Sequence, residues 1–245
     1  MDNPFGTDEE RAEAALIAAV GNVLRSNNRE VPEDFVAGLF AHAVVEDLIR
    51  YDPHQLAELA SSFWRFLAER KPGVPKIRFE SRLVPDGAEH IESVSIIEII
   101  NDDMPFLVDS VLAELAERGI EVRLVVHPVF SVVRDAAGRL TAFKGVKPAA
   151  DGALRESVIY IHVERSEEEA GRAEIVEAIE RVLADVHVCV HDWRAMIGRV
   201  AELIAELKAN PPPLPAAEIA EAVAFLARGQ QFHLPRHPRL HIHGR

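Results

Sequence analysis

The sequence has 245 residues, of which 48% are hydrophobic, a single cysteine, Cys189, and a formal net charge of -13 at pH 7. These values exclude an intrinsically disordered chain, an internal disulfide framework and a zinc site built mainly on thiolates. The acidic balance would repel a phosphate backbone, so it also disfavours general nucleic-acid binding.

Residues 1–72 are predicted to form an N-terminal helical segment, because apolar residues recur there at three- and four-residue steps. The recurring residues are Ala14, Ile17, Val20 and Leu24 in a first helix, Phe35, Leu39, Ala43 or Val44, and Leu48 in a second, and Leu56, Leu59 or Ala60, Phe63 and Leu67 in a third. The third helix has a clear start, with Asp52 as N-cap and Pro53 in the first turn. The run KPGVP at 71–75 ends the segment.

Beyond this point the apolar period becomes that of a strand. The alternation at 76–84 predicts a strand with one buried and one wet face. Runs rich in β-branched residues at 91–100 and 157–163 predict two further strands. Another extended stretch, at 122–134, is broken at His127-Pro128 and leads to a weaker strand near 140–144.

Helical periods return twice in this second half. The first covers residues 105–118. The second keeps three- and four-residue steps from Ile175 to Leu207, which predicts one long helix, or two nearly collinear ones, from about residue 166 to 208. The run VHVCV at 186–190 alternates like a strand, but the longer helical period outweighs it. A short helix is predicted around residues 216–227.

This order of elements predicts an α+β fold, with N-terminal helices followed by a mainly antiparallel, ferredoxin-like sheet. The helices are expected on one face of the sheet. Residues 73–210 would form this domain and its long packing helix, and residues 211–245 would hold the short helix and an atypical tail rich in Arg, His and Pro. The last strand of the ferredoxin-like pattern is missing, and strand 76–84 is the candidate for that edge.

No common catalytic signature is present in the context it requires. Strand 91–100 leads into its helix without a glycine, and there is no P-loop, serine elbow or HExxH motif. The pairs Glu46-Asp47 and His191-Asp192 are interpreted as solvated helix faces. His241 and His243 are interpreted as parts of an unstructured tail. We therefore expect no catalytic, cofactor-binding or metal-binding residue in this chain.

The most distinctive polar residues are Asn101, Asp102 and Asp103, which stand directly before Met104-Pro105 and a helical run. They could be a catalytic or metal-binding cluster, but helix capping explains them without any chemistry. One of the three would accept hydrogen bonds from the first free amides, and a carboxylate would lie at the positive end of the helix dipole. Pro105 would stand in the first turn, where its missing N–H costs nothing.

Three segments of the sequence resemble a known family. They are YDPHQLAELASSFWRFLAERKPG, EIINDDMPFLVDSVLAELAERGIEVRLVVHPVFSVVRD and DVHVCVHDWRAMIGRVAELIAEL. Together they resemble the N-terminal region of the large bacterial NAD-dependent glutamate dehydrogenases, from about Tyr51 to Phe225. In that family this region looks like ACT-type regulatory domains that precede a distant catalytic domain.

The resemblance implies that the full-length protein converts L-glutamate, NAD and water to 2-oxoglutarate, ammonia and NADH. The catalytic and NAD-binding regions would lie beyond residue 245, so the chain is expected to be inactive alone and to hold no cofactor. The ending after Phe225 departs from the family pattern, and a frameshift, a truncated gene or the chosen limit of an expressed segment would each produce such an ending. The expected partners of the chain are the remainder of the dehydrogenase and other copies of the subunit. We expect no binding to nucleic acid or to a membrane.

Many ACT domains carry a pattern like D-R-P-G-L-L at the turn from strand to helix. The matching residues here run from Asp103 to Val108, and Phe106 stands where the pattern has glycine. A phenyl ring would occupy the space that a ligand needs, so a structural or subunit-interface role is favoured over binding of an amino-acid effector at this turn. The alternative is a stand-alone ACT-like amino-acid sensor or an oligomerisation module.

The sequence carries no signal for export. Its beginning, MDNPFGTDEER, lacks the basic and then apolar layout of a secretory signal, and no run approaches the length of a membrane span. We therefore expect a cytoplasmic protein.

Overall fold

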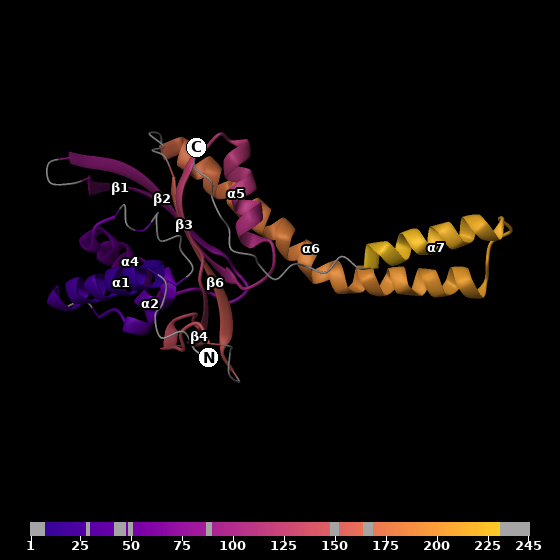
Figure 1. The fold of residues 1–245 in the computed structure, drawn as a ribbon, viewed down its shortest axis with the longest axis horizontal. Coiled ribbons are helices and arrows are strands. Elements are labelled where there is room, and N and C mark those ends of the chain that lie inside the picture. Colours follow the sequence, from indigo (N-terminus) through magenta and orange to yellow (C-terminus); the bar gives the residue numbers. More distant parts are fainter. Residues whose placement is uncertain are drawn as a thin grey trace.

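The computed structural model describes residues 8–27, 30–41, 48, 51–86, 90–147, 152–163 and 169–230. It has an α+β fold, in which helices cover both faces of an antiparallel sheet and one long helix extends away from the body (Figure 1). The fold class predicted from the sequence is confirmed.

The N-terminal segment contains the helices α1 (Asp8–Ser26), α2 (Glu33–Phe40) and α4 (Pro53–Leu67). The predicted start of α4 is confirmed, because the Asp52 side chain accepts hydrogen bonds from the amides of His54 and Gln55. The Gln55 side chain in turn accepts one from the Asp52 amide, which completes a capping box. Ala43 and Val44, predicted in the second helix, lie outside the described residues.

The sheet has six strands, with the order β1-β2-β6-β4-β5 and with β3 also paired to β6. The strands are β1 (Lys76–Asp86), β2 (His90–Asp102), β3 (Val122–Val126), β4 (Val129–Arg134), β5 (Leu140–Phe143) and β6 (Leu154–Val163). Strand β1 pairs antiparallel with β2 and so fills the predicted edge position. The break predicted at His127-Pro128 separates β3 from β4. Strand β2 continues two residues beyond its predicted end, to Asp102.

The prediction that helices lie on one face of the sheet is wrong. Ile96 and Ile100 of β2 pack in one hydrophobic core with α1, α2 and α4. Ile97 and Ile99 pack in a second core with α5 (Leu107–Glu117) and the first part of α6 (Glu169–Ala209). Successive residues of a strand point to opposite faces, so a central strand that is apolar at every position needs cover on both sides.

Helix α6 is a single helix of 41 residues, as the helical period predicted. Val186 is buried against the second core, whereas Val188, two residues later, is 57% exposed. This difference excludes the alternating strand. Beyond the body, the remaining turns of α6 pair with α7 (Ala216–Gln230), which folds back along them (Figure 1).

The segment after α4 is held against the turn between β4 and β5. The amide of Arg70 donates to the Gly138 carbonyl at 2.9 Å, and the amide of Leu140 donates to the Ala68 carbonyl at 2.8 Å. Gly138 has a φ of 85°, and a Cβ atom added there would lie 2.5 Å from the carbonyl oxygen of Arg70. Only glycine therefore permits this close approach of two backbones.

Gly138→Ala is expected to destabilise the fold by about 2 to 4 kcal/mol, because it adds a backbone clash to the strain of a left-handed residue. Gly73→Ala is the matched control, since Gly73 has a φ of 77° but nothing within 4 Å of an added Cβ. That change should cost only about 1 kcal/mol. Urea unfolding of both variants measures the difference, and equal losses would contradict the proposed close approach.

Candidate functional site

The acidic turn predicted as a helix cap lies between β2 and α5. Strand β2 continues through Asn101 and Asp102, and α5 begins only at Leu107. Its N-cap residue is Phe106, and no side chain forms a cap hydrogen bond. The capping prediction for Asn101, Asp102 and Asp103 is therefore wrong, and Pro105 precedes the N-cap instead of standing in the first turn.

Long-range ion pairs explain why these carboxylates do not cap the helix. Asp102 Oδ1 lies 2.7 Å from Arg70 Nη2, and Asp103 Oδ2 lies 3.2 Å from Arg155 Nε. The amide of Asp103 also donates to the Arg155 carbonyl, which keeps the chain extended beside β6. Asn101 is buried, with only 5% of its surface exposed. The turn thus joins β2 to its neighbours.

Asp102, whose side chain is 36% exposed, stands at the edge of a charge cluster, which we define as Arg70, Asp102, Arg134 and Glu156. Glu156 Oε1 accepts hydrogen bonds from Arg70 Nη1 and Arg134 Nε, and Glu156 Oε2 accepts one from Arg134 Nη2, each at 2.7 Å. The side chains of Arg70, Arg134 and Glu156 are all 0% exposed. Two positive and two negative charges balance, which a buried group of ions requires.

The remaining donors of the charge cluster bind backbone carbonyls around the end of α4. Arg134 donates to Leu67 and Gly138, and Arg70 donates to Val74. The cluster therefore fixes the C-terminal end of α4 to strands β2, β4 and β6.

Phe106 has a φ of 71°, the only positive value outside glycine among the described residues. It thus has the left-handed conformation that glycine adopts without strain, at the position where the ACT-like pattern has glycine. Its ring is partly buried and packs against the core of α5 and α6. The expectation that this ring excludes an effector from the turn stays a prediction.

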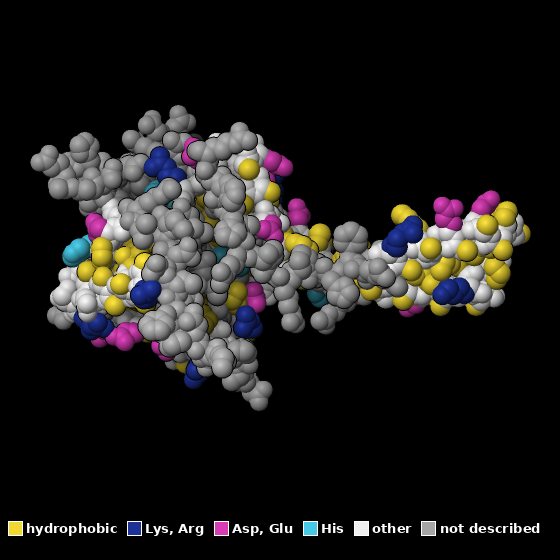
Figure 2. Space-filling model, in the orientation of Figure 1, with side chains coloured by type: hydrophobic (Ala, Val, Ile, Leu, Met, Phe, Trp, Pro, Cys, Tyr) yellow, Lys and Arg dark blue, Asp and Glu magenta, His cyan; other side chains and the backbone are white. Residues whose placement is uncertain are grey.

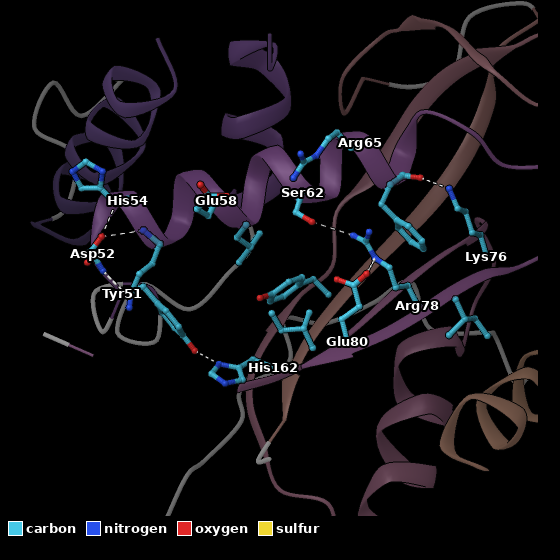
Figure 3. Close-up of a pocket in the computed structure, with 16 residues that line it drawn as sticks. Tyr51, Asp52, His54, Glu58, Ser62, Arg65, Lys76, Arg78, Glu80 and His162 are labelled. Atoms are coloured by element: carbon cyan, nitrogen blue, oxygen red, sulfur yellow. Dashed lines mark hydrogen bonds and ion pairs between the residues drawn. The ribbon is translucent and has the colours of Figure 1, made fainter. Parts of the chain in front are cut away.

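A cavity that the sequence did not indicate lies on the other face of the sheet, between α4, β1 and the central strands (Figure 3). Its volume is about 950 Å³. Its apolar walls include Leu59, Phe66, Ile96 and Tyr160. A pocket of this size with a few polar groups is typical of small-molecule sites.

Three basic side chains lie at one end of the cavity: Arg65 of α4, and Lys76 and Arg78 of β1 (Figure 3). Arg78 forms an ion pair with the buried Glu98, which stands opposite it in the β1–β2 register, and it donates to Ser62 Oγ at 3.1 Å. Glu80 Oε1 lies 3.5 Å from Arg78 Nε. The charge of Arg78 is therefore balanced.

Lys76 is held differently, since its ammonium group donates at 2.7 Å to the carbonyls of Phe66 and Glu69. It also lies 4.4 Å from the centre of the Phe66 ring. Burial and the neighbouring charge of Arg78 lower the pKa of Lys76, and Glu69 and Glu98 oppose this only in part. Neither Lys76 nor Arg65 forms an ion pair within the described ranges.

The opposite end of the cavity is acidic. Asp52 is the N-cap residue of α4, and His54 and Glu58 come from the first two turns of that helix. The Tyr51 hydroxyl is hydrogen-bonded to His162 Nδ1 across the cavity (Figure 3). The sequence signal for this site is a polar stripe on α4 beside its apolar stripe. Such a stripe usually faces solvent, so the pattern alone could not reveal a cavity.

The structure does not bring together the other candidate residues. His191 and Asp192 are exposed on α6, and Glu46-Asp47 and residues 231–245 lie outside the described part. Among the described residues, no three His, Cys, Asp or Glu side chains are grouped as metal ligands would be. Within the same ranges, no helix combines the length and apolar character needed to span a membrane.

Comparison with known proteins matches residues 35–179 to the family described as glutamate dehydrogenase, ACT1 domain. The NAD-specific glutamate dehydrogenase of Halomonas elongata is 33% identical over 225 residues, which cover 89% of this chain and 14% of that protein. The NAD-specific glutamate dehydrogenase of Pseudomonas aeruginosa is 28% identical over 194 residues, covering 78% of this chain and 12% of that protein. The chain thus spans a small part of these relatives' length.

Glu156→Gln is expected to destabilise the fold by about 3 to 5 kcal/mol, because it leaves two buried arginines facing a single carboxylate. Asp103→Asn removes an ion pair that is partly exposed and should cost less than about 1 kcal/mol. Urea unfolding monitored by circular dichroism compares the two variants. A loss for Glu156→Gln no larger than that for Asp103→Asn would show that the charge cluster has no structural role.

Proposed function

The chain belongs to the glutamate dehydrogenase ACT1 domain family, the N-terminal ACT-like region of NAD-specific glutamate dehydrogenases, and from this premise we propose that it is a non-catalytic regulatory and structural segment of a large dehydrogenase. In this proposal the full-length enzyme oxidises L-glutamate to 2-oxoglutarate with NAD, and both NAD and the reacting substrate bind outside this chain. The segment acts in the cytoplasm with the remainder of the enzyme.

This proposal is carried by the ion pairs that the carboxylates of the acidic turn form with arginines. A general base must reach the proton that it removes, directly or through one water. Glu156 is fully buried between two arginines, and Asp102 and Asp103 each have an arginine partner from a distant part of the chain. This pairing supports a structural role for the carboxylates that most resemble a catalytic cluster.

The purified chain of 245 residues is expected to produce no NADH from L-glutamate and NAD above the rate of a protein-free mixture. A full-length glutamate dehydrogenase added to the same mixture serves as the positive control. Asp102→Asn should give the same rate as the unaltered chain. Turnover that this substitution abolishes would overturn the non-catalytic role.

A second role, as an oligomerisation module, is favoured by the pair formed by α7 and the end of α6, which we call the helical hairpin (residues 187–230). Five of the seven large hydrophobic side chains that are exposed in the described structure lie in it: Val188, Met196, Leu203, Leu214 and Phe225. Hydrophobic side chains cover much of this projecting part (Figure 2). Two helices alone cannot enclose a core, so such a surface is suited to a partner.

Charge favours a second copy of the chain as that partner. Residues 187–230 contain five acidic and four basic side chains, a net charge of -1, whereas the whole chain carries -13. Two copies would therefore repel one another least at their hairpins. Docking of two hairpins would give a four-helix arrangement with a closed apolar interior.

Met196→Glu combined with Phe225→Glu is expected to convert a self-associating chain to a monomer, because it places charges in the apolar contact. Sedimentation velocity measures the change across micromolar concentrations. Val74→Glu, which alters an exposed valine on the body of the molecule, is the matched control and should leave self-association unchanged. A monomeric unaltered chain, or equal effects of both changes, would contradict docking through the hairpin.

A further inference from the structure

We propose that the cavity between α4 and β1 binds an apolar monocarboxylate, a hydrocarbon chain that carries one carboxylate and no amino group. The carboxylate would lie beside Lys76 and Arg78, and the hydrocarbon chain would extend along the apolar walls toward Tyr51 and His162. This binding site goes beyond the proposed function, which assigns no ligand to this face of the sheet.

Lys76 and Arg78 converge on one point of the cavity, the ring of Phe66. Nζ of Lys76 lies 4.4 Å from the centre of this ring, and Cζ of Arg78 lies 4.5 Å from it. The two residues are separated by one residue of β1, so their side chains leave the strand on the same face. Figure 3 shows both beneath the last turns of α4. An anionic group beside the Phe66 ring is therefore attracted by both cations.

Both cations keep hydrogen-bond donors for a ligand. A lysine ammonium group has three donors, and Lys76 uses two of them for the carbonyls of Phe66 and Glu69. The hydrogen bonds that Arg78 forms within the described residues use Nε and Nη2, which leaves Nη1. A carboxylate has two oxygens that accept hydrogen bonds, so it suits donors of this kind.

The negative charge of a ligand would be stabilised here, because Lys76 has no ion pair within the part of the chain that the structure describes. Arg78, in contrast, is paired with the buried Glu98. Burial and the charge of Arg78 lower the pKa of Lys76, so its ammonium group is held at a cost. A carboxylate at this partly desolvated position would offset both effects.

The strand register shows how far the cavity extends from these cations. Glu80, which lies four residues beyond Lys76 on the same face of β1, stands opposite Ile96 of β2. Ile96 in turn pairs with His162 of β6, the residue that is hydrogen-bonded to Tyr51. Four residues of a strand span about 13 Å, so an elongated ligand can lie along the cavity with its head at the cations.

The walls along this length are largely apolar. Leu59 and Phe66 are seven residues apart on α4, which places them on the same side of the helix and about 10 Å apart along its axis. Ile96 and Tyr160 line the cavity from the sheet. A hydrocarbon chain in contact with these side chains would remove apolar surface from water, which favours binding.

The surrounding charges disfavour two related classes of ligand. An α-amino acid would bring its ammonium group beside Lys76 and Arg78, and like charges repel one another. A dicarboxylate would place its second carboxylate toward the end of the cavity that Asp52, Glu58 and Glu80 line. The site therefore selects for a ligand with a single negative charge and an uncharged tail.

Isothermal titration of octanoate into the 245-residue chain tests this site. We expect saturable binding of a single octanoate. Octanamide, which has the same chain without the charge, and 2-aminooctanoate should each bind at least roughly tenfold more weakly, because they lose a charged hydrogen bond or add a repulsive contact. Equal affinities of octanoate and octanamide would overturn the role of the cations. Absence of saturable heat with octanoate at millimolar concentrations would overturn the site.

Variants of Lys76 locate the carboxylate. Lys76→Met should weaken octanoate binding at least roughly tenfold and leave octanamide binding unchanged, whereas Lys76→Arg should retain most of the octanoate affinity. Lys144→Met, which removes an exposed lysine beside β5 at the opposite edge of the sheet, is the matched control and should bind octanoate normally. Equal affinity of all three variants for octanoate would place the ligand elsewhere. If Lys76→Met fails to fold, the comparison of octanoate with octanamide still tests the charge on the unaltered chain.

These outcomes are independent of the turnover assay. A chain that fails to bind octanoate and also fails to oxidise glutamate would refute this site while leaving the proposed non-catalytic role standing.

Discussion

The burial of Glu156 between Arg70 and Arg134 is the interaction on which the rest of the structure depends. A carboxylate without exposed surface is tolerable only if positive charge and hydrogen bonds replace the water it has lost. Arg70 comes from the end of the helical segment, and Arg134 and Glu156 come from the sheet. The requirement for charge balance therefore fixes the helices to the sheet and also draws in Asp102 from the β2–α5 turn.

The two faces of the sheet have different consequences for function. On one face, α5 and α6 pack continuously against Ile97, Ile99 and their neighbours, and this core supports the projecting hairpin. On the other face, α4 crosses above β1, whose charged residues Lys76 and Arg78 point toward it. These two side chains join the strand to the helix, because Lys76 donates to the Phe66 carbonyl and Arg78 donates to Ser62 Oγ. The cavity lies beside these contacts, between α4 and β1.

Much of the fold could be predicted from periodicity, because that signal is local and repeated. In the sequence of α6, the long helical period outweighs an alternating run of valines and predicts the helix. The Asp52 cap of α4 is predicted from residue types alone. The acidic turn was misinterpreted because its local pattern satisfied the rules for a helix cap, while the arginines that bind it are distant in sequence. The prediction of helices on one face failed for a related reason, since β2 is apolar on both faces and the helices that cover each face are distant from it in sequence. The cavity could not be predicted, because it depends on how closely α4 and β1 approach each other in the folded chain.

Hydrogen exchange of the intact chain tests most directly whether the charge cluster unites the helical segment with the sheet. If it does, the slowest amides of α4 and those of β2 and β6 will open with the same free energy, as parts of one cooperative unit. Opening of α4 at a much lower free energy than the central strands would contradict this and would show the helices to be an independent unit resting on the sheet.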